Sequence, residues 1–270
     1  MKTLTWKDIH LKPHKETAHK GDNGRVLIIG GSENYVGCLV FAGLAALRSG
    51  VDVVTVAAPE RVAWAINCLT PDLITRKFSG KYFTLKHARD IFKLAEKNDV
   101  VLIGNGIGRK QQTKNFVKKI ISYLNKIKKP FVIDADALSM IRIQDLENGI
   151  LTPHHGEFGV LLKNSKLTEN NFRKFLNNTI IVLKGHIDYV YAKNKKVANK
   201  TGHKRMTVAG TGDILAGLCA GFLAQRQTLW ESACYATFFS GKLGEHEQKK
   251  RPDHYLASDL LTDIKEVVHG

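Results

Sequence analysis

Short apolar runs rich in β-branched residues alternate along the chain with segments whose apolar positions recur at helical spacing. The runs are continuously apolar, which is typical of parallel strands buried on both faces. The predicted strands are 25–29, 52–57, 100–103, 131–133 and 180–183. The predicted helices are 36–49, 85–97, 111–127, 172–177, 211–225, 229–248 and 257–267. This alternation predicts a doubly wound α/β fold with three layers, α/β/α, around a central, mostly parallel sheet.

A short hairpin is expected after the last of these strands. Residues 187–192 and 195–198 would pair, with Lys193 and Asn194 at the turn. No internal repeat or low-complexity linker interrupts the chain, so we expect residues 1–270 to form a single domain. Ligands of such sheets bind beyond the carboxyl ends of the strands. The glycine-rich and charged motifs follow predicted strands, and we therefore expect them to meet at one rim.

Charge and hydropathy narrow the class of protein. The chain has 41 Lys and Arg against 25 Asp and Glu, a net charge of +16. The basic residues are scattered in pairs and triplets without a nucleic-acid-binding motif, so we predict a solvated basic surface and no nucleic-acid partner. No segment predicts a secretory signal or a membrane span. The four cysteines form no C-x-x-C pair, which fits a reducing, cytoplasmic location.

The segment Met206-Thr-Val-Ala-Gly-Thr-Gly-Asp-Ile-Leu-Ala-Gly217 has the strongest chemical signal. Gly210, Thr211 and Gly212 stand at the start of an apolar helix, where backbone N–H groups and the helix dipole can hold a phosphoryl group. Asp213 follows them, where a carboxylate can accept the proton of an attacking hydroxyl. An aspartate that caps the helix behind a glycine turn is the alternative.

Lys184 and Asp188 lie in a second candidate segment, Ile180-Ile-Val-Leu-Lys-Gly-His-Ile-Asp188. Lys184 ends a buried strand and can reach phosphates, and Asp188 can contact a ribose or a metal-bound water. A lysine that merely ends a strand before a hairpin explains the pattern equally well.

A third segment, Ile150-Leu-Thr-Pro-His-His-Gly-Glu-Phe158, places a histidine at the rim. Pro153 stops the strand, and Glu157 is expected to open the next helix. We interpret His154 as a hydrogen-bonding residue beside a substrate, because neighbouring loop residues rarely ligate one zinc ion together.

Three further strand ends suit the approach of a ligand. Residues 104–108 lack the glycine spacing and the later acid of a dinucleotide fingerprint, which argues against a hydride-transfer enzyme, and residues 26–37 lack the G-K-[ST] of a P-loop. Gly37-Cys38 at a helix start still allows close contact. Asp134 and Asp136 could hold Mg²⁺ through waters, or Asp136 could cap a helix.

In this order the motifs resemble one family, the NAD(P)H-hydrate dehydratases, whose domain is fused to an epimerase domain in other proteins. The resemblance covers residues 20 to 264 or so. It rests on the succession of Gly30-Gly31-Ser32 with Tyr35 and Gly37, Gly104 to Gly108, Asp134 to Leu138, Thr152-Pro153-His154 with Gly156-Glu157-Phe158, Leu183-Lys184-Gly185, and Gly210 to Asp213 with Leu215-Ala216-Gly217.

The resemblance implies a ribokinase-like fold and a metabolite-repair reaction. ADP or ATP, with Mg²⁺, would phosphorylate the hydroxyl of hydrated NADH or NADPH (NADHX or NADPHX), and phosphate would then leave. Asp213 would be the catalytic base and a substrate contact, and Cys38, Gly106 and His154 would contact the substrate. The implied nucleotide-binding residues are Lys184, Gly185, His186, Ile187, Asp188, Gly210, Thr211 and Gly212.

The sequence departs from the family pattern at several of these positions. Asn105 replaces a usual proline, Cys38 an alanine and Ala209 a glycine, and Asp188 stands where many bacterial members have threonine. The choice between ADP and ATP, and between NADHX and NADPHX, stays open. A homo-oligomer, as a tetramer, and a separate NAD(P)H-hydrate epimerase are family-level expectations. The alternative function is an ATP-dependent kinase of the same fold that phosphorylates a vitamin precursor or a sugar.

Overall fold

The protein is described here by a computed structural model that covers residues 1–12, 17 and 19–269. One sheet runs through this part of the chain in the order β3-β2-β1-β4-β5-β6-β7-β8-β9. Neighbours from β3 to β7 pair in parallel, and β8 and β9 are antiparallel. The strands are β1 Arg25–Ile29, β2 Val53–Pro59, β3 Ile74–Phe78, β4 Val100–Ile103, β5 Phe131–Ile133, β6 Gly149–Leu151, β7 Thr179–Leu183, β8 Asp188–Tyr191 and β9 Lys196–Asn199.

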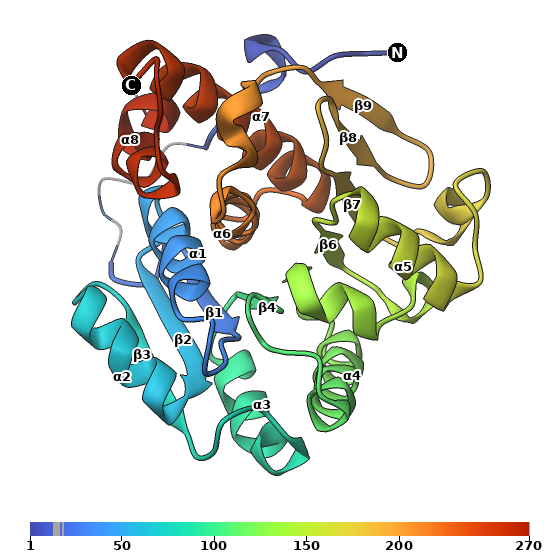
Figure 1. Ribbon diagram of the computed structural model, residues 1–270. Helices are drawn as coiled ribbons and strands as arrows, with labels where there is room; N and C mark the ends of the chain where they lie inside the picture. Colours follow the sequence, from blue (N-terminus) through green and yellow to red (C-terminus); the bar gives the residue numbers. More distant parts are fainter. Residues whose placement is uncertain (13–16, 18, 270) are drawn as a thin grey trace.

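Helices cover both faces of the sheet (Figure 1). They are α1 Gly37–Arg48, α2 Glu60–Leu69, α3 Ala88–Glu96, α4 Gln111–Lys126, α5 His155–Ser165, α6 Thr211–Ala224, α7 Leu229–Lys250 and α8 Ala257–His269. Val26 and Ile28 of β1 belong to the core shared with α1, α6, α7 and α8. Leu27 and Ile29 belong to the core shared with α3, α4 and α5. The prediction of a three-layer α/β/α fold with a mostly parallel sheet is confirmed.

The continuous apolar runs explain the central strands. All four of these β1 side chains are fully buried, and burying each contributes about 1.5–3 kcal/mol before the loss of conformational entropy. The predicted limits of β1, β4 and β5 are confirmed, whereas β2 begins one residue later and ends two residues later than predicted. No helix in the described part of the chain is long and apolar enough to cross a bilayer.

The sequence pattern missed three elements and misjudged others. Strand β3 lies at the sheet edge with mostly exposed or half-buried side chains, β6 has only three residues, and α2 follows directly on β2. The predicted helix 85–97 begins instead with a 3₁₀ turn, Leu85–His87. The predicted helix 172–177 is wrong, because this segment forms only the 3₁₀ turn Phe172–Phe175.

The hairpin and the helix before it also differ in their limits. Ile187 and Ala192 lie outside the hairpin strands, and β9 reaches Asn199. Helix α5 begins at His155 and not at Glu157, because His154 caps it. These shifts move each boundary by one or a few residues and leave the order of elements unchanged.

The carboxyl ends of β4, β5, β6 and β7 lie next to each other, which brings distant motifs to one rim. Gly104 after β4 has φ +132, and a Cβ there would lie 1.9 Å from the carbonyl oxygen of Asp134 after β5. Only glycine permits this backbone approach. Helix α6 starts at the same rim and passes between α1 and α7 (Figure 1).

Candidate active site

The Asp134 side chain connects four strand ends at the rim. It is 2 % exposed. Its Oδ1 accepts hydrogen bonds from Thr152 Oγ1 after β6 (2.7 Å) and from Lys184 Nζ after β7 (3.1 Å). Its Oδ2 accepts from Asn105 Nδ2 after β4 (2.9 Å). The carboxylate is thus held by three donors from three different loops.

Asp213 lies in the first turn of α6, which begins at Thr211. Gly210 occupies the N-cap position with φ +102, so the alternative of Asp213 as a helix cap is wrong. Its Oδ1 accepts a hydrogen bond from Asn105 Nδ2 (2.7 Å). Burial, and then the charge of Asp134, raise the pKa of the Asp213 carboxyl to about 7, against the opposing effects of Asn105 and Lys184. A carboxyl that titrates near neutrality suits a general base.

The Lys184 ammonium pairs with Asp134 and lies near the start of α6. Burial lowers its pKa, but the charges of Asp134, Glu157 and Asp213 outweigh burial, and the pKa of Lys184 is raised. The side chain therefore keeps its positive charge. A Cβ on Gly212 would lie 3.3 Å from Lys184 Nζ, so the ammonium faces the first turn of α6, where backbone N–H groups lack helical acceptors.

A cavity of about 630 Å³ lies beside Lys184 and the start of α6. Its volume is in the usual range for small-molecule sites. Among the described residues its wall has three lysines, Lys184, Lys200 and Lys204, and one carboxylate, Asp188. The wall includes all the sequence-predicted nucleotide-binding residues except Gly210, namely Lys184, Gly185, His186, Ile187, Asp188, Thr211 and Gly212.

The cavity wall also includes a segment that the sequence reasoning missed. Residues 200–204 follow β9 and line the cavity together with the β7–β8 turn. Their sequence, Lys-Thr-Gly-His-Lys, combines cationic and hydrogen-bonding groups with a glycine after a strand, and this signal could have indicated an anion site.

Gly106 and Cys38, predicted substrate contacts, lie together. A Cβ on Gly106 would stand 2.7 Å from Cys38 Sγ. Burial, and then the charge of Asp213, raise the pKa of the Cys38 thiol to about 12, so this thiol is neutral. Gly106 and Cys38 therefore provide an uncharged surface at the part of the rim near Asp213, which we call the Asp213 end of the rim.

His154 takes a local structural position. Its Nδ1 accepts hydrogen bonds from the backbone N–H groups of Gly156 (3.0 Å) and Glu157 (3.3 Å), and Glu157 in turn accepts from the His154 N–H (2.9 Å). This arrangement caps α5. The ring is 60 % exposed, and its backbone pairs with that of Lys184. A substrate contact of His154 remains a prediction.

Asp136 has protein donors of its own. It accepts from the backbone N–H of Gly108 (3.0 Å) and from Arg109 Nε (2.7 Å). The 3₁₀ helix here, Ala135–Met140, has Asp134 at its N-cap position, so the alternative of Asp136 as a cap is wrong. The Mg²⁺ contact of Asp134 and Asp136 through water remains a prediction.

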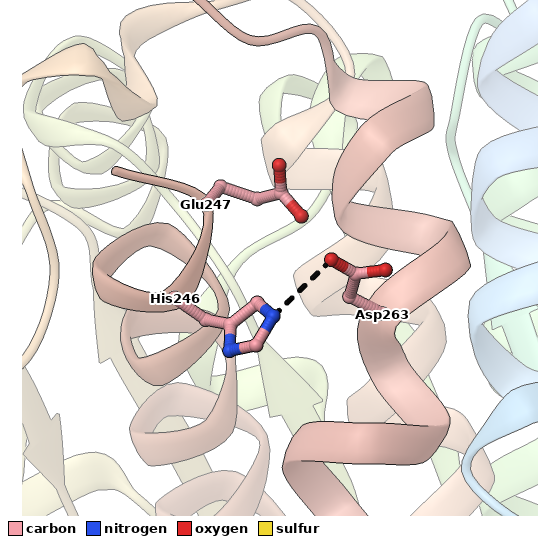
Figure 2. A group of neighbouring side chains, drawn as sticks. All are labelled: His246, Glu247 and Asp263. Carbon is pink, nitrogen blue, oxygen red and sulfur yellow. Dashed lines mark ion pairs between the residues drawn. The ribbon is translucent and has the colours of Figure 1, made fainter. Parts of the chain in front are cut away.

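One other group of the described residues has metal-ligand spacing. His246, Glu247 and Asp263 place ligand atoms within 4.8 Å of one another (Figure 2). Lys250 Nζ, however, lies 2.7 Å from Asp263 Oδ2, and Arg251 pairs with Glu247. Because two cations already neutralise the two carboxylates, we interpret this group as an ion-pair cluster that joins α7 to α8.

Solved ribokinase-like and carbohydrate kinase structures share this architecture, so the fold is ribokinase-like, as the family resemblance implied. The family model described as NAD(P)H-hydrate dehydratase matches residues 26–266. The chain therefore belongs to the NAD(P)H-hydrate dehydratase family, and the resemblance noted in the sequence is confirmed.

Individual relatives agree with this assignment. An ADP-dependent (S)-NAD(P)H-hydrate dehydratase of Cenarchaeum symbiosum is 32 % identical over 264 residues, which cover 94 % of this chain and 91 % of that protein. A bifunctional NAD(P)H-hydrate repair enzyme of Methanothermobacter thermautotrophicus is 39 % identical over 96 % of this chain and 52 % of that protein. The chain thus spans about half the length of the bifunctional relatives it matches.

A solved structure of the ADP/ATP-dependent NAD(P)H-hydrate dehydratase from Bacillus subtilis, co-crystallized with ATP/Mg²⁺, has the same fold. Its TM-score is 0.77 at 24 % identity, over 95 % of this chain and 93 % of that one.

Proposed function

We propose that the protein catalyses the ADP- or ATP-dependent dehydration of NADHX and NADPHX, a metabolite-repair reaction that restores NADH and NADPH. One observation supports this above all. A carboxyl whose pKa is raised to about 7, that of Asp213, stands in the first turn of α6 beside a cavity with a cationic wall. Such a site pairs a base with a place for a phosphoryl group.

The proposed phosphoryl donor binds in the cavity. Lys184, Lys200 and Lys204 supply positive charge for its phosphates. Gly210, Thr211 and Gly212 bring the N–H groups and the dipole of α6 to the transferring phosphoryl group. Gly185 to Asp188 form the wall against the rest of the nucleotide.

Mg²⁺ would neutralise phosphate charge when bound with the donor. The donor set of this chain fits a metal that is held mainly by phosphates. Asp134 already accepts from three side chains, and Asp188 accepts from the Gly185 N–H (3.0 Å) and from Asn199 Nδ2 (3.4 Å). The proposed contribution of Asp134 and Asp136 therefore passes through bound water.

The proposed chemistry runs in two steps. Asp213 accepts the proton of the ring hydroxyl while the hydroxyl oxygen attacks the terminal phosphorus of the donor, and ADP leaves from ATP, or AMP from ADP. The C–O bond then breaks, and phosphate departs with the bonding electrons. The lone pair of the ring nitrogen stabilises the positive charge that develops on this carbon. Loss of a proton from the neighbouring ring carbon then restores the ring double bond.

The substrate would occupy the Asp213 end of the rim. We propose that the ring lies against Gly106 and Cys38, and that His154 contacts it from the start of α5. A separate NAD(P)H-hydrate epimerase, a homo-oligomeric state and a cytoplasmic location remain predictions that accompany this proposal.

The test mixes the protein with NADHX or NADPHX, each with ADP or ATP, in Mg²⁺, and follows the absorbance of the reduced ring. Recovery of this absorbance with release of phosphate is expected. A stable phosphorylated product from a sugar or a vitamin precursor, with no recovery of the reduced ring, would instead establish the kinase alternative. Asp213→Asn should abolish turnover while nucleotide still binds.

A further inference from the structure

Asn105 joins the two carboxylates of the rim through one atom. Its Nδ2 donates one hydrogen bond to Asp213 Oδ1 (2.7 Å) and another to Asp134 Oδ2 (2.9 Å). An amide NH₂ has two hydrogens, so both are used. The side chain is fully buried, and bonds to carboxylates are stronger than those between neutral groups.

The backbone around Asn105 is fixed against the neighbouring strand. The Asn105 carbonyl accepts from the Gly31 N–H (2.9 Å), and the Gly104 N–H donates to the Ile29 carbonyl (3.1 Å). A Cβ on Gly30 would lie 2.3 Å from the Asn105 carbonyl oxygen, so β1 and this loop are in close backbone contact. The amide therefore projects from a rigid support.

The carbonyl oxygen of the Asn105 side chain, in contrast, makes no stabilising contact of this kind. Asn105 Oδ1 is buried and has no hydrogen-bond partner among the described residues. An unsatisfied buried polar atom costs about 1–3 kcal/mol, which an apolar residue would not cost. Because an apolar side chain would pack here without this cost, we infer that the NH₂ group of Asn105 has a role beyond packing.

We propose that Asn105 is a positioning residue for the reaction: its NH₂ group ties Asp213 to the Asp134 anchor and leaves Oδ2 of Asp213 free for the substrate hydroxyl. This proposal rests on the proposed function. In the described part of the chain, the hydrogen bond to the Asp213 carboxylate comes from Asn105 Nδ2 and goes to Oδ1. Asp134 is itself held by Thr152 and Lys184, so the orientation of Asp213 follows from the strands and not from a mobile side chain.

Asn105 also favours the ionised form of Asp213. Burial and the charges of Asp134 and Glu157 raise the pKa of this carboxyl, while the Asn105 hydrogen bond and the charge of Lys184 lower it. Removing the donor should therefore raise the pKa further. A rise of about one unit above 7 would reduce the ionised fraction at pH 7 from about one half to about one tenth.

The test compares Asn105→Leu with Asn98→Leu in the 270-residue chain. Asn98 is a buried asparagine outside the rim whose Nδ2 bonds to a backbone carbonyl. For Asn105→Leu we expect the acidic limb of the kcat profile to shift upward by about one unit, so that kcat falls about fivefold at pH 7 and recovers above pH 9. The KM of Asn105→Leu for nucleotide should equal that of the wild type. The control Asn98→Leu should have the same pH dependence of kcat as the wild type.

A second measurement does not depend on activity. The Asp213 carboxyl is titrated by ¹³C NMR in the wild type and in Asn105→Leu, with Asp213→Asn to assign the signal. An upward shift in the variant supports the positioning role. An unchanged titration in a folded variant overturns it, whatever the enzyme's reaction. An upward shift in a protein that fails to dehydrate NADHX would refute the proposed function and leave the electrostatic role of Asn105 intact.

Discussion

A single methyl group at Gly212 should separate the stability of α6 from its proposed role in phosphoryl transfer. Gly212 is the second residue of α6 and lines the cavity. The Cβ of an alanine would lie 3.3 Å from Lys184 Nζ. The lysine must then move by a few tenths of an ångström, and the methyl occupies space next to the N–H groups that we propose to face the phosphoryl group.

The two effects of Gly212→Ala have opposite signs. Alanine favours a helix over glycine by about 1 kcal/mol, and the contact with Lys184 offsets part of this gain. The free energy of unfolding should therefore stay level or rise slightly. Removing one donor of an oxyanion-type site costs about 10²–10³ in kcat. For a donor that is displaced and not deleted, we expect a 10- to 100-fold fall in kcat/KM, equivalent to about 1.4–2.7 kcal/mol.

Gly159→Ala is the matched control. Gly159 lies in α5 with an exposed Cβ position and no atom within 4 Å of it. This variant should gain about 0.5–1 kcal/mol in urea unfolding and keep wild-type kinetics with NADHX and ADP or ATP. If Gly212→Ala has the same kcat/KM as Gly159→Ala, the proposed place of the phosphoryl group at the start of α6 is refuted.

Three further predictions follow from the ionisable groups. Because the pKa of Asp213 is raised to about 7, its charge opposes folding above the pKa of the unfolded chain, so Asp213→Asn should be more stable than the wild type at pH 8 and no more stable near pH 4 in urea unfolding. The Cys38 thiol, with its pKa raised to about 12, should react with iodoacetamide at pH 8 far more slowly than exposed Cys68, as measured by peptide mass spectrometry. Burial raises the pKa of Asp263, but a hydrogen bond shared with Glu247, whose own pKa is raised, and another from Lys250 bring it to about 2. The stabilisation from the ionised Asp263 should therefore be lost as pH falls from about 4 to 2, and Asp263→Asn should unfold about 1–3 kcal/mol more easily at pH 7.

The fold could be predicted where burial alone decides the structure. Val26 to Ile29 are buried on both faces, and a continuous apolar run expresses this directly. Strand β3 differs, because Ile74 is 44 % exposed and its strand conformation comes from pairing with β2. Phe172 is buried against the rings of Phe158 and Tyr191. Its apolar side chain therefore reflects packing in a 3₁₀ turn and did not indicate an α-helix.

The site could be predicted only as far as the rim. Parallel strands end on the same side, so the residues that follow them had to share one edge. The partners of each side chain depend on the strand order, and no local pattern encodes it. Thr152 meets Asp134 because β6 pairs with β5. Residues 200–204 reach the cavity because β8 runs antiparallel to β7 and β9 antiparallel to β8, so β9 ends at the same edge of the sheet as β7.

The pairing of charges at the rim explains how one site could hold both the proposed cation for phosphate, Lys184, and the proposed base, Asp213. If Lys184 formed its ion pair with Asp213, the pKa of that carboxyl would fall and the base would weaken. Lys184 instead pairs with Asp134 at 3.1 Å, and Asp213 receives a hydrogen bond from the neutral amide of Asn105. Asp134 thus takes the direct positive charge, and its own negative charge helps to raise the pKa of Asp213 to about 7. The ammonium thus lies near the start of α6, and the pKa of the proposed base stays near neutrality, which suits a general base.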